Sequence, residues 1–270
     1  MSSPTEITVS QLSRLIGLPA SPRIIDVRDA DDFNSDPRLI PGSHRRDYRT
    51  APQWTGDVSQ VAVIICQKGK KLSQGAAAWL RTYGADAQSL EGGFEAWRDA
   101  GQMLLTTAKL PKYKDGKTVW VTRARPKIDR IACPWLIRRF VDPGAGFLFV
   151  APSEVMAVAE RFDATPFDID DVFWSHRGET CTFDTMIAEF ELASKPLQNL
   201  ARIIRAADTA RLDQAPEAAG LLAASLGYSR MFKDDLAQLD AAMALYDALF
   251  RWCRDATEET HNWPSAKQSG

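Results

Sequence analysis

The amino-acid sequence predicts an α/β N-terminal domain, in which helices flank a parallel sheet, followed by a mainly helical α+β C-terminal domain. From residue 8 to about residue 101, short apolar runs alternate with helical segments, a pattern that favours a layered parallel sheet. Residues 102–117 lose this periodicity and contain lysine, threonine, glycine and proline, so we expect a linker there. After residue 184 the strand signal fades, and helical periodicity continues to about residue 258.

Apolar patterning also places the individual elements. In the first domain it predicts strands at 23–27, 61–66 and 87–90 and helices at 73–83 and 92–100. In the second domain it predicts strands at 119–123 and 146–151. A helix follows the first of these strands, and Pro134 is expected to kink or break it. Ser153 is a candidate cap for a helix that reaches about Phe162, and an apolar stripe from Leu236 to Cys253 predicts one long helix.

Composition and charge exclude several classes of function. With 270 residues, 45% hydrophobic and 25% charged, the chain is typical of a soluble globular protein of one large or two ordinary domains. The formal net charge of -2 gives no bulk basic field and no DNA-reading helix is recognisable, so the sequence argues against DNA as a partner. Neither a secretory signal nor an apolar run of about 20 residues is present, so we expect a cytoplasmic protein without membrane association.

The segment CQKGKK, which begins at Cys66, directly follows a predicted strand and precedes a predicted helix. In such a passage the loop amides and the positive end of the helix point at the centre of the loop, which favours an anion. Gly69 permits a backbone conformation that other residues avoid, and the neighbouring lysines add positive charge. These surroundings would stabilise a nucleophilic thiolate. The alternative is that Cys66 only ends a buried strand, as unpaired cysteines often do.

Three further motifs accompany the Cys66 loop in the first domain. They are IIDVRDADDF at 24–33, IPGSH at 40–44 and LEGGFEAW at 90–97. In content and order, over about residues 8–101, they resemble the signatures of the rhodanese-like family. The resemblance implies a sulfurtransferase in which Cys66 accepts a sulfane sulfur as a persulfide and passes it on. It also implies two partners, a small sulfur donor such as thiosulfate or a persulfide, and a thiol acceptor.

The same resemblance assigns roles within the loop. Cys66 is the nucleophile, and the loop has the six-residue size of the sulfur-transferring members rather than the greater length found in related phosphatases. The residues implied in substrate binding are Gln67, Lys68, Gly69, Lys70 and Lys71. Lys71 stands where the family commonly has arginine, so we expect weaker bidentate binding of an anion.

Two charged residues of the first motif, Asp26 and Arg28, could act in catalysis or in the fold. We favour a buried ion pair that fixes the loops, because charges are rarely buried without a partner. His44 is likewise expected to hold the IPGSH turn.

Three clusters stand out in the second half of the chain: RPKIDRIACPWLIRRFVDP at 125–143, FWSHRGETCTFD at 173–184 and IIRAADT at 203–209. They resemble the C-terminal domain of the ChrB-type chromate resistance family over about residues 118–262. The DNA-binding N-terminal part of the regulators in that group is not apparent, and the rhodanese-like domain stands in its place. The resemblance implies a role in chromate or thiol stress, with chromate as a candidate ligand.

His176, Cys181 and Asp184 combine nitrogen, sulfur and oxygen donors within nine residues. They are candidate ligands of a zinc or other transition-metal ion, the one candidate cofactor, and Asp129 and Asp208 could join them through folding. The alternative is a structural role, with Cys181 reduced and buried. The basic residues of the first cluster could bind an oxyanion or form a solvated helix face; they are Lys127, Arg130, Arg138 and Arg139.

The leading interpretation is a sulfurtransferase that forms a persulfide on Cys66 and is coupled to a ChrB-type domain. The alternative is a protein, regulatory or not, that senses or binds chromate or a metal, with the Cys66 loop as a redox or anion-binding site. A transcription regulator is the third class, against which the charge and the missing DNA-reading helix argue.

Overall fold

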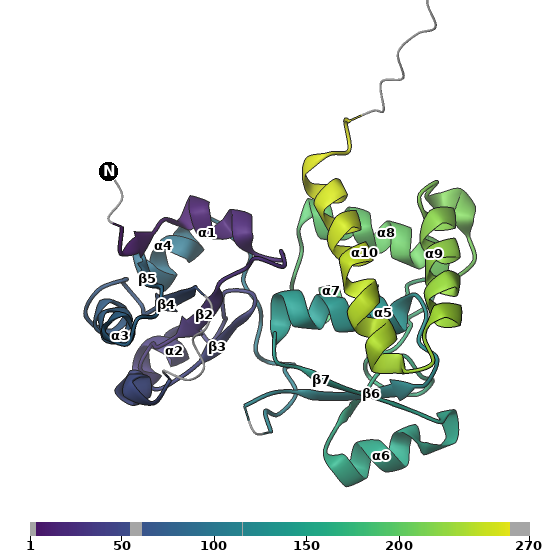
Figure 1. Ribbon diagram of the computed structural model, residues 1–270, viewed down its shortest axis with the longest axis horizontal. Coiled ribbons are helices and arrows are strands. Elements are labelled where there is room, and N and C mark those ends of the chain that lie inside the picture. The colour runs from purple at the N-terminus through teal and green to yellow at the C-terminus, as the bar shows by residue number, and fades with distance from the viewer. Residues whose placement is uncertain (1–3, 55–60, 115, 260–270) are drawn as a thin grey trace, which may run out of the picture.

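The computed structural model describes residues 4–54, 61–114 and 116–259, which form two domains that lie side by side (Figure 1). The predicted end of the second domain at residue 262 lies outside the described residues. Among the described residues, no helix combines the length and apolar character needed to cross a membrane.

The first domain is built on a five-stranded parallel sheet with the strand order β1-β5-β4-β2-β3. Its strands are β1 Glu6–Ile7, β2 Arg23–Asp26, β3 Ser43–Arg45, β4 Ala62–Ile65 and β5 Ala87–Leu90. The three inner strands are those predicted from apolar runs, because strands of a parallel sheet are covered on both faces and need apolar side chains throughout. The edge strands β1 and β3 have only two and three residues and therefore carry no periodicity.

Helices cover both faces of this sheet, as the sequence predicts. The helices of the domain are α1 Val9–Leu15, α2 Ala30–Ser35, α3 Lys71–Thr82 and α4 Gly93–Asp99, with a 3-10 helix at Tyr48–Gln53. Ile24 and Val63 face the apolar cluster that contains residues of α1 and α4, whereas Ile25 and Ile64 face the cluster that contains residues of α3. The alternation of side chains along each strand thus divides the core in two.

The second domain combines a small parallel sheet with a larger helical part. The sheet has the order β7-β6-β8, and its strands are β6 Val119–Arg123, β7 Gly146–Val150 and β8 Thr165–Pro166. The helices are α5 Asp129–Leu136, α6 Val155–Phe162, α7 Thr182–Glu189, α8 Lys195–Asp208, α9 Ala218–Met231 and α10 Asp235–Asp255. Helix α6 covers one face of the sheet, and the remaining helices are gathered on the opposite face (Figure 1).

Three local predictions for the second domain need correction. Of the kink or break expected at Pro134, the break is wrong, because α5 contains Pro134 and runs on into a π-helical turn at Ile137–Val141. Ser153 does not cap α6, because it lies within a short 3-10 turn and its hydroxyl donates to Glu154 Oε1 at 3.1 Å. The stripe on α10 begins one turn later than expected, since Leu236 is exposed and Leu239 is buried.

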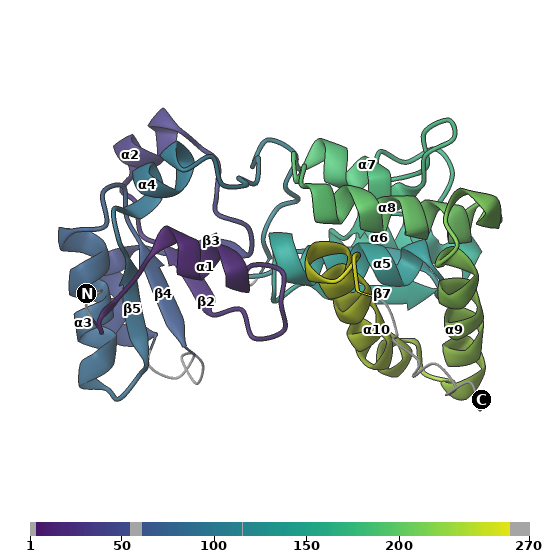
Figure 2. The ribbon, with the colours of Figure 1, turned by 90° about the horizontal axis from the view of Figure 1, so that it is seen from above.

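The two domains share one continuous apolar cluster. It contains Leu12 and Leu39 of the first domain together with Phe140 and Phe250 of the second. Backbone hydrogen bonds cross the boundary as well, since the amide of Gly42 donates to the carbonyl of Phe140 at 2.7 Å. Seen from above, the end of α1 points towards the helical part of the second domain (Figure 2). The domains are therefore packed against each other rather than merely tethered.

Candidate functional site

Cys66 lies directly after β4, at the carboxyl end of a central strand of the first sheet. Its side chain is nearly buried, and its Sγ lies 3.1 Å from the Oγ of Ser73 in the first turn of α3. Of the loop residues assigned to substrate binding, Lys68, Lys70 and Lys71 are exposed. The thiol at the base of the loop thus lies beside a hydroxyl in the first turn of α3, in a loop that carries three exposed lysines.

The loop is held against the start of α4, which belongs to the LEGGFEAW motif. The amides of Phe94 and Glu95 donate to the carbonyls of Cys66 and Gln67, both at 3.0 Å. The side-chain amide of Gln67 donates to Glu95 Oε1 at 3.2 Å. Gly69 and Gly93 meet where the two segments touch, and both have positive φ. The second glycine of the motif is therefore needed to let α4 approach the loop.

Substitution of Gly93 by alanine should destabilise the first domain by about 2–4 kcal/mol. Alanine is strained at the positive φ of this position, and its Cβ atom would overlap with neighbouring atoms. A Cβ atom there would collide with the carbonyl of Cys66 and the amide of Gly69, both backbone groups that cannot move aside. Urea unfolding followed by circular dichroism measures the change. Gly75→Ala is the matched control: the added Cβ would meet nothing within 4 Å, and alanine favours the helix. Equal stability of wild type and Gly93→Ala would contradict this account of the loop.

Asp26 and Arg28 form the buried ion pair that the sequence predicts. Arg28 Nε donates to Asp26 Oδ2 at 2.8 Å, and both side chains are almost fully buried. The guanidinium also donates to the carbonyls of Asp36 and Arg38 and stacks 3.7 Å over the ring of Phe94. The pair therefore ties β2 to the loop that follows α2 and to α4.

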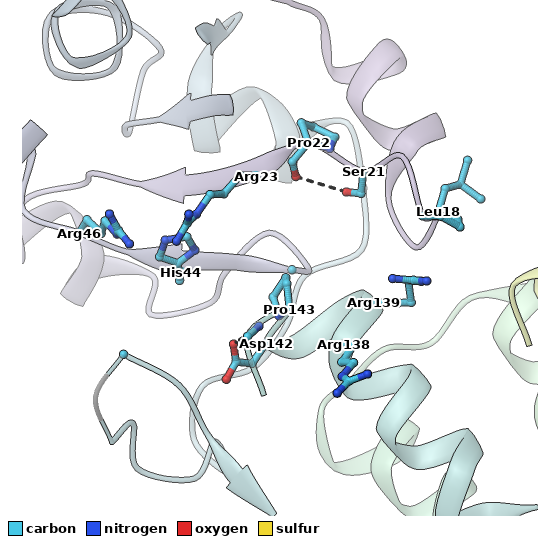
Figure 3. Close-up of a pocket in the computed structure, with 14 residues that line it drawn as sticks. Leu18, Ser21, Pro22, Arg23, His44, Arg46, Arg138, Arg139, Asp142 and Pro143 are labelled. Atoms are coloured by element: carbon cyan, nitrogen blue, oxygen red, sulfur yellow. Dashed lines mark hydrogen bonds between the residues drawn. The ribbon is translucent and has the colours of Figure 1, made fainter. Parts of the chain in front are cut away.

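A cavity of about 500 Å³ lies between the two domains (Figure 3). Arg23, His44 and Arg46 line it from the first domain, while Arg138 and Arg139 line it from the second. His44, for which the sequence predicts a role in holding the IPGSH turn, lines this cavity. Arg138 pairs with Asp240 at 2.7 Å and Arg139 pairs with Asp247 at 2.8 Å, so α10 holds both arginines in place. The other two basic candidates lie elsewhere: Lys127 is exposed, and Arg130 pairs with Asp168.

A second polar group lies within the C-terminal domain, around His176. The Nε2 atom of His176 is 3.2 Å from Asp208 Oδ2, 3.4 Å from Asp168 Oδ1 and 3.5 Å from Asp129 Oδ2. Asp129 begins α5, and Asp208 ends α8. Each of the three sequence clusters of this half thus contributes one residue: Asp129, His176 and Asp208.

Burial and the three neighbouring carboxylates shift the pKa values of residues in this group. Hydrogen bonds to Asp129, Asp168 and Asp208 raise the pKa of His176 well above its usual value. Burial raises the pKa of Asp129, which has no exposed surface. Asp129 Oδ2 accepts hydrogen bonds from the amides of Thr182, at 2.6 Å, and Phe183 at the start of α7. The N-terminus of that helix therefore supports a buried carboxylate.

Of the three ligands suggested by their spacing, only His176 points into this group. Asp184 Oδ2 accepts from the amide of Cys181 at 3.0 Å, and its Oδ1 accepts from Arg205 at 2.9 Å. Cys181 is fully buried, and burial raises the pKa of its thiol well above the usual range. Asp168, which follows β8, belongs to the group although no motif or spacing in the sequence singles it out.

Comparison with known proteins agrees with this two-part architecture. The family model of the rhodanese-like domain matches residues 8–100. The family model of the ChrB C-terminal domain matches residues 120–253. The chain therefore belongs to the rhodanese-like family through its first domain and carries a ChrB C-terminal domain as its second.

Individual relatives match one domain each. Protein ChrB of Cupriavidus metallidurans is 36% identical to this chain over 132 residues. The matched part is 48% of this chain and 39% of the relative, so the chain spans about two fifths of the length of that protein. The thiosulfate sulfurtransferase GlpE of Shewanella oneidensis is 34% identical over 103 residues, 37% of this chain and 98% of the relative. The solved structure of a rhodanese-like domain protein from Staphylococcus aureus is 27% identical in sequence, with a TM-score of 0.30. The match covers 34% of this chain and 90% of the chain in that structure.

Proposed function

We propose that this protein is a sulfurtransferase that carries a persulfide on Cys66. The observation that supports it most is the position of the thiol after β4, under a loop with three exposed lysines and beside Ser73. The similarity of the first domain to thiosulfate sulfurtransferases supports the same reaction and suggests a thiosulfate-type donor. With its ChrB C-terminal domain, the protein would serve in resistance to chromate or thiol stress.

The proposed reaction has two steps, each a displacement at sulfur. In the first, the Cys66 thiolate attacks the sulfane sulfur of thiosulfate; a new S–S bond forms, the old one breaks, and sulfite leaves with the electron pair. In the second, an acceptor thiolate attacks the outer sulfur of the persulfide, and the Cys66 thiolate is released. No external oxidant or reductant is needed, because the sulfane sulfur keeps its oxidation level as it passes from thiosulfate to Cys66 and then to the acceptor thiolate.

The residues of the loop have distinct tasks in this scheme. The Ser73 hydroxyl lies within hydrogen-bond distance of Sγ and can stabilise the thiolate both before attack and on release. Helix α3 begins at Lys71 without a side-chain cap from Lys70, which leaves amides of its first turn to face an anion. The exposed lysines would draw the charged donor to the loop.

Mass spectrometry after treatment with thiosulfate tests this proposal. We expect one added sulfur atom on the peptide that contains Cys66 and none on the other cysteine peptides. The other thiols are poorer nucleophiles, because burial raises the pKa of Cys133 and Cys181 well above the usual value and that of Cys253 to about 11. A protein that takes up no sulfur, or takes it up on Cys253, would contradict the assignment.

A second candidate function is oxyanion binding, and the arginine-lined cavity between the domains favours it. Four arginines from two domains surround this space, and a guanidinium can grip an oxyanion with two hydrogen bonds. If the protein senses chromate there, calorimetry should show binding that Arg46→Gln weakens about tenfold or more, since hydrogen bonds to charged groups contribute roughly 1.5–3 kcal/mol. Arg49→Gln is the control, because Arg49 is exposed and does not line the cavity. Equal binding by both variants, or none by wild type, would rule out this cavity.

A further inference from the structure

We propose that Asp129, His176 and Asp208 form a binding site for one divalent transition-metal ion, separate from the Cys66 loop. One atom of each side chain lies within 4.8 Å of the others. Two ligands that each stand about 2.0–2.2 Å from one ion, at angles of 90–110°, are roughly 2.8–3.6 Å apart. The distances of 3.2 Å and 3.5 Å from His176 Nε2 to Asp208 and Asp129 fall within that range. Each of the two carboxylates thus already stands at ligand spacing from His176, and the ligand atoms of the whole set lie within 4.8 Å of one another.

Asp129 provides independent support for a cation. The carboxylate is fully buried, and its Oδ1 has no hydrogen-bond partner among the residues that the structure describes. A buried carboxylate with an oxygen that accepts no hydrogen bond is costly unless a positive charge lies beside it. Asp129 shares the single imidazole of His176 with Asp168 and Asp208. The amides of Thr182 and Phe183 orient the other oxygen, Oδ2, towards His176, as supporting hydrogen bonds do for metal ligands.

Asp168 is close to His176, but its carboxylate already forms ion pairs and a hydrogen bond with other side chains. Its Oδ2 pairs with Arg130 at 3.3 Å and Arg123 at 3.6 Å, and its Oδ1 accepts from Thr182 Oγ1 at 2.8 Å. With Asp168 balanced by two arginines, Asp129 and Asp208 are the two carboxylates left facing a single imidazole. Their two negative charges correspond to one divalent ion, with His176 as the third ligand once the ion has displaced its imidazole proton.

The donor set and its exposure indicate the class of ion. One imidazole nitrogen with two carboxylate oxygens suits zinc, cobalt, manganese or ferrous ions better than calcium or magnesium, which prefer oxygen alone. The side chains of His176 and Asp208 are 41% and 20% exposed. An ion held there would keep coordination positions open to solvent, as ions do in sites that take up water or a small ligand.

Titration of the chelator-treated full-length chain with Co²⁺ and Zn²⁺ tests the site. We expect one ion per chain, visible Co²⁺ absorption without the intense band of a thiolate ligand, and a rise in melting temperature with Zn²⁺. Asp208→Asn and His176→Ala should weaken binding by about 100-fold or more, since loss of a supporting hydrogen bond alone costs about 10–100-fold. Asp208 is partly exposed, so its variant keeps the test valid even if Asp129→Asn does not fold.

Asp170→Asn is the matched control, because Asp170 is an exposed carboxylate two residues from Asp168. It should bind both ions as the wild type does. A wild-type chain that binds no stoichiometric ion would overturn the proposal and leave His176 as the centre of an internal ion-pair network. Equal binding by wild type and Asp208→Asn, or a thiolate band that disappears in Cys181→Ser, would overturn it as well.

Discussion

Replacement of Cys66 by serine is expected to abolish sulfur transfer from thiosulfate, with a loss of more than about 1,000-fold in kcat/KM. A serine hydroxyl cannot form a persulfide, and it is far less ionised than a thiol at neutral pH. The fold should survive, because serine is nearly isosteric and its hydroxyl can keep the hydrogen bond to Ser73. The rate of thiocyanate formation from thiosulfate and cyanide measures the effect.

Cys253→Ser is the matched control for this experiment. Cys253 is also buried, but it lies in α10 of the second domain, away from the loop. We expect the control to keep the wild-type rate. If Cys66→Ser remained active, the persulfide would have to form elsewhere, and the proposed function would be wrong.

Replacement of Asp26 by asparagine should destabilise the first domain by about 3–5 kcal/mol, because it leaves the Arg28 guanidinium buried without its counter-charge. Asparagine has nearly the same shape as aspartate, so the effect reports the charge rather than a cavity. Arg28 also holds the carbonyls of Asp36 and Arg38, and the loop after α2 should loosen with it. Urea unfolding measures the free energy, and hydrogen exchange of the amides around residues 36–38 locates the change.

Asp47→Asn provides the comparison for a surface pair. Asp47 and Arg49 also form an ion pair, at 3.5 Å, but both side chains are largely exposed. Asparagine can still accept the hydrogen bond from the amide of Arg49 that caps the 3-10 helix. We expect a change of less than about 1 kcal/mol. If the two variants lost equal stability, burial of the first pair would not be the cause.

The sequence predicts the first domain well because its signals are local. The inner strands read as apolar runs, and the motifs around Asp26 and Gly93 lie at strand ends and at a turn where their residue types are required. β1 and β3 escape prediction, since short edge strands are defined by their neighbours in the sheet and not by a pattern of their own. Ser153 shows a similar limit, because a capping residue type does not fix the first residue of a helix.

The polar group of the second domain could be predicted only in part. His176 was identifiable from its cluster, but proximity in sequence favoured Cys181 and Asp184, which the first turn of α7 directs to backbone and arginine partners. Asp129 and Asp208, which the sequence indicates as residues that could join His176 through folding, are 79 residues apart and meet it because α5, α7 and α8 pack together. Tertiary packing thus determines which carboxylates face the imidazole.

The division of the core separates the surroundings of Cys66 from the contact between the two domains. The shared apolar cluster joins one face of the first sheet to the second domain, whereas Cys66 and α3 pack in a separate cluster confined to the first domain. Substitutions that loosen the packing of α3 can therefore alter the surroundings of the thiol without removing contacts between the two domains. The α3 side of the first domain and the contact between the domains are therefore two separately packed regions.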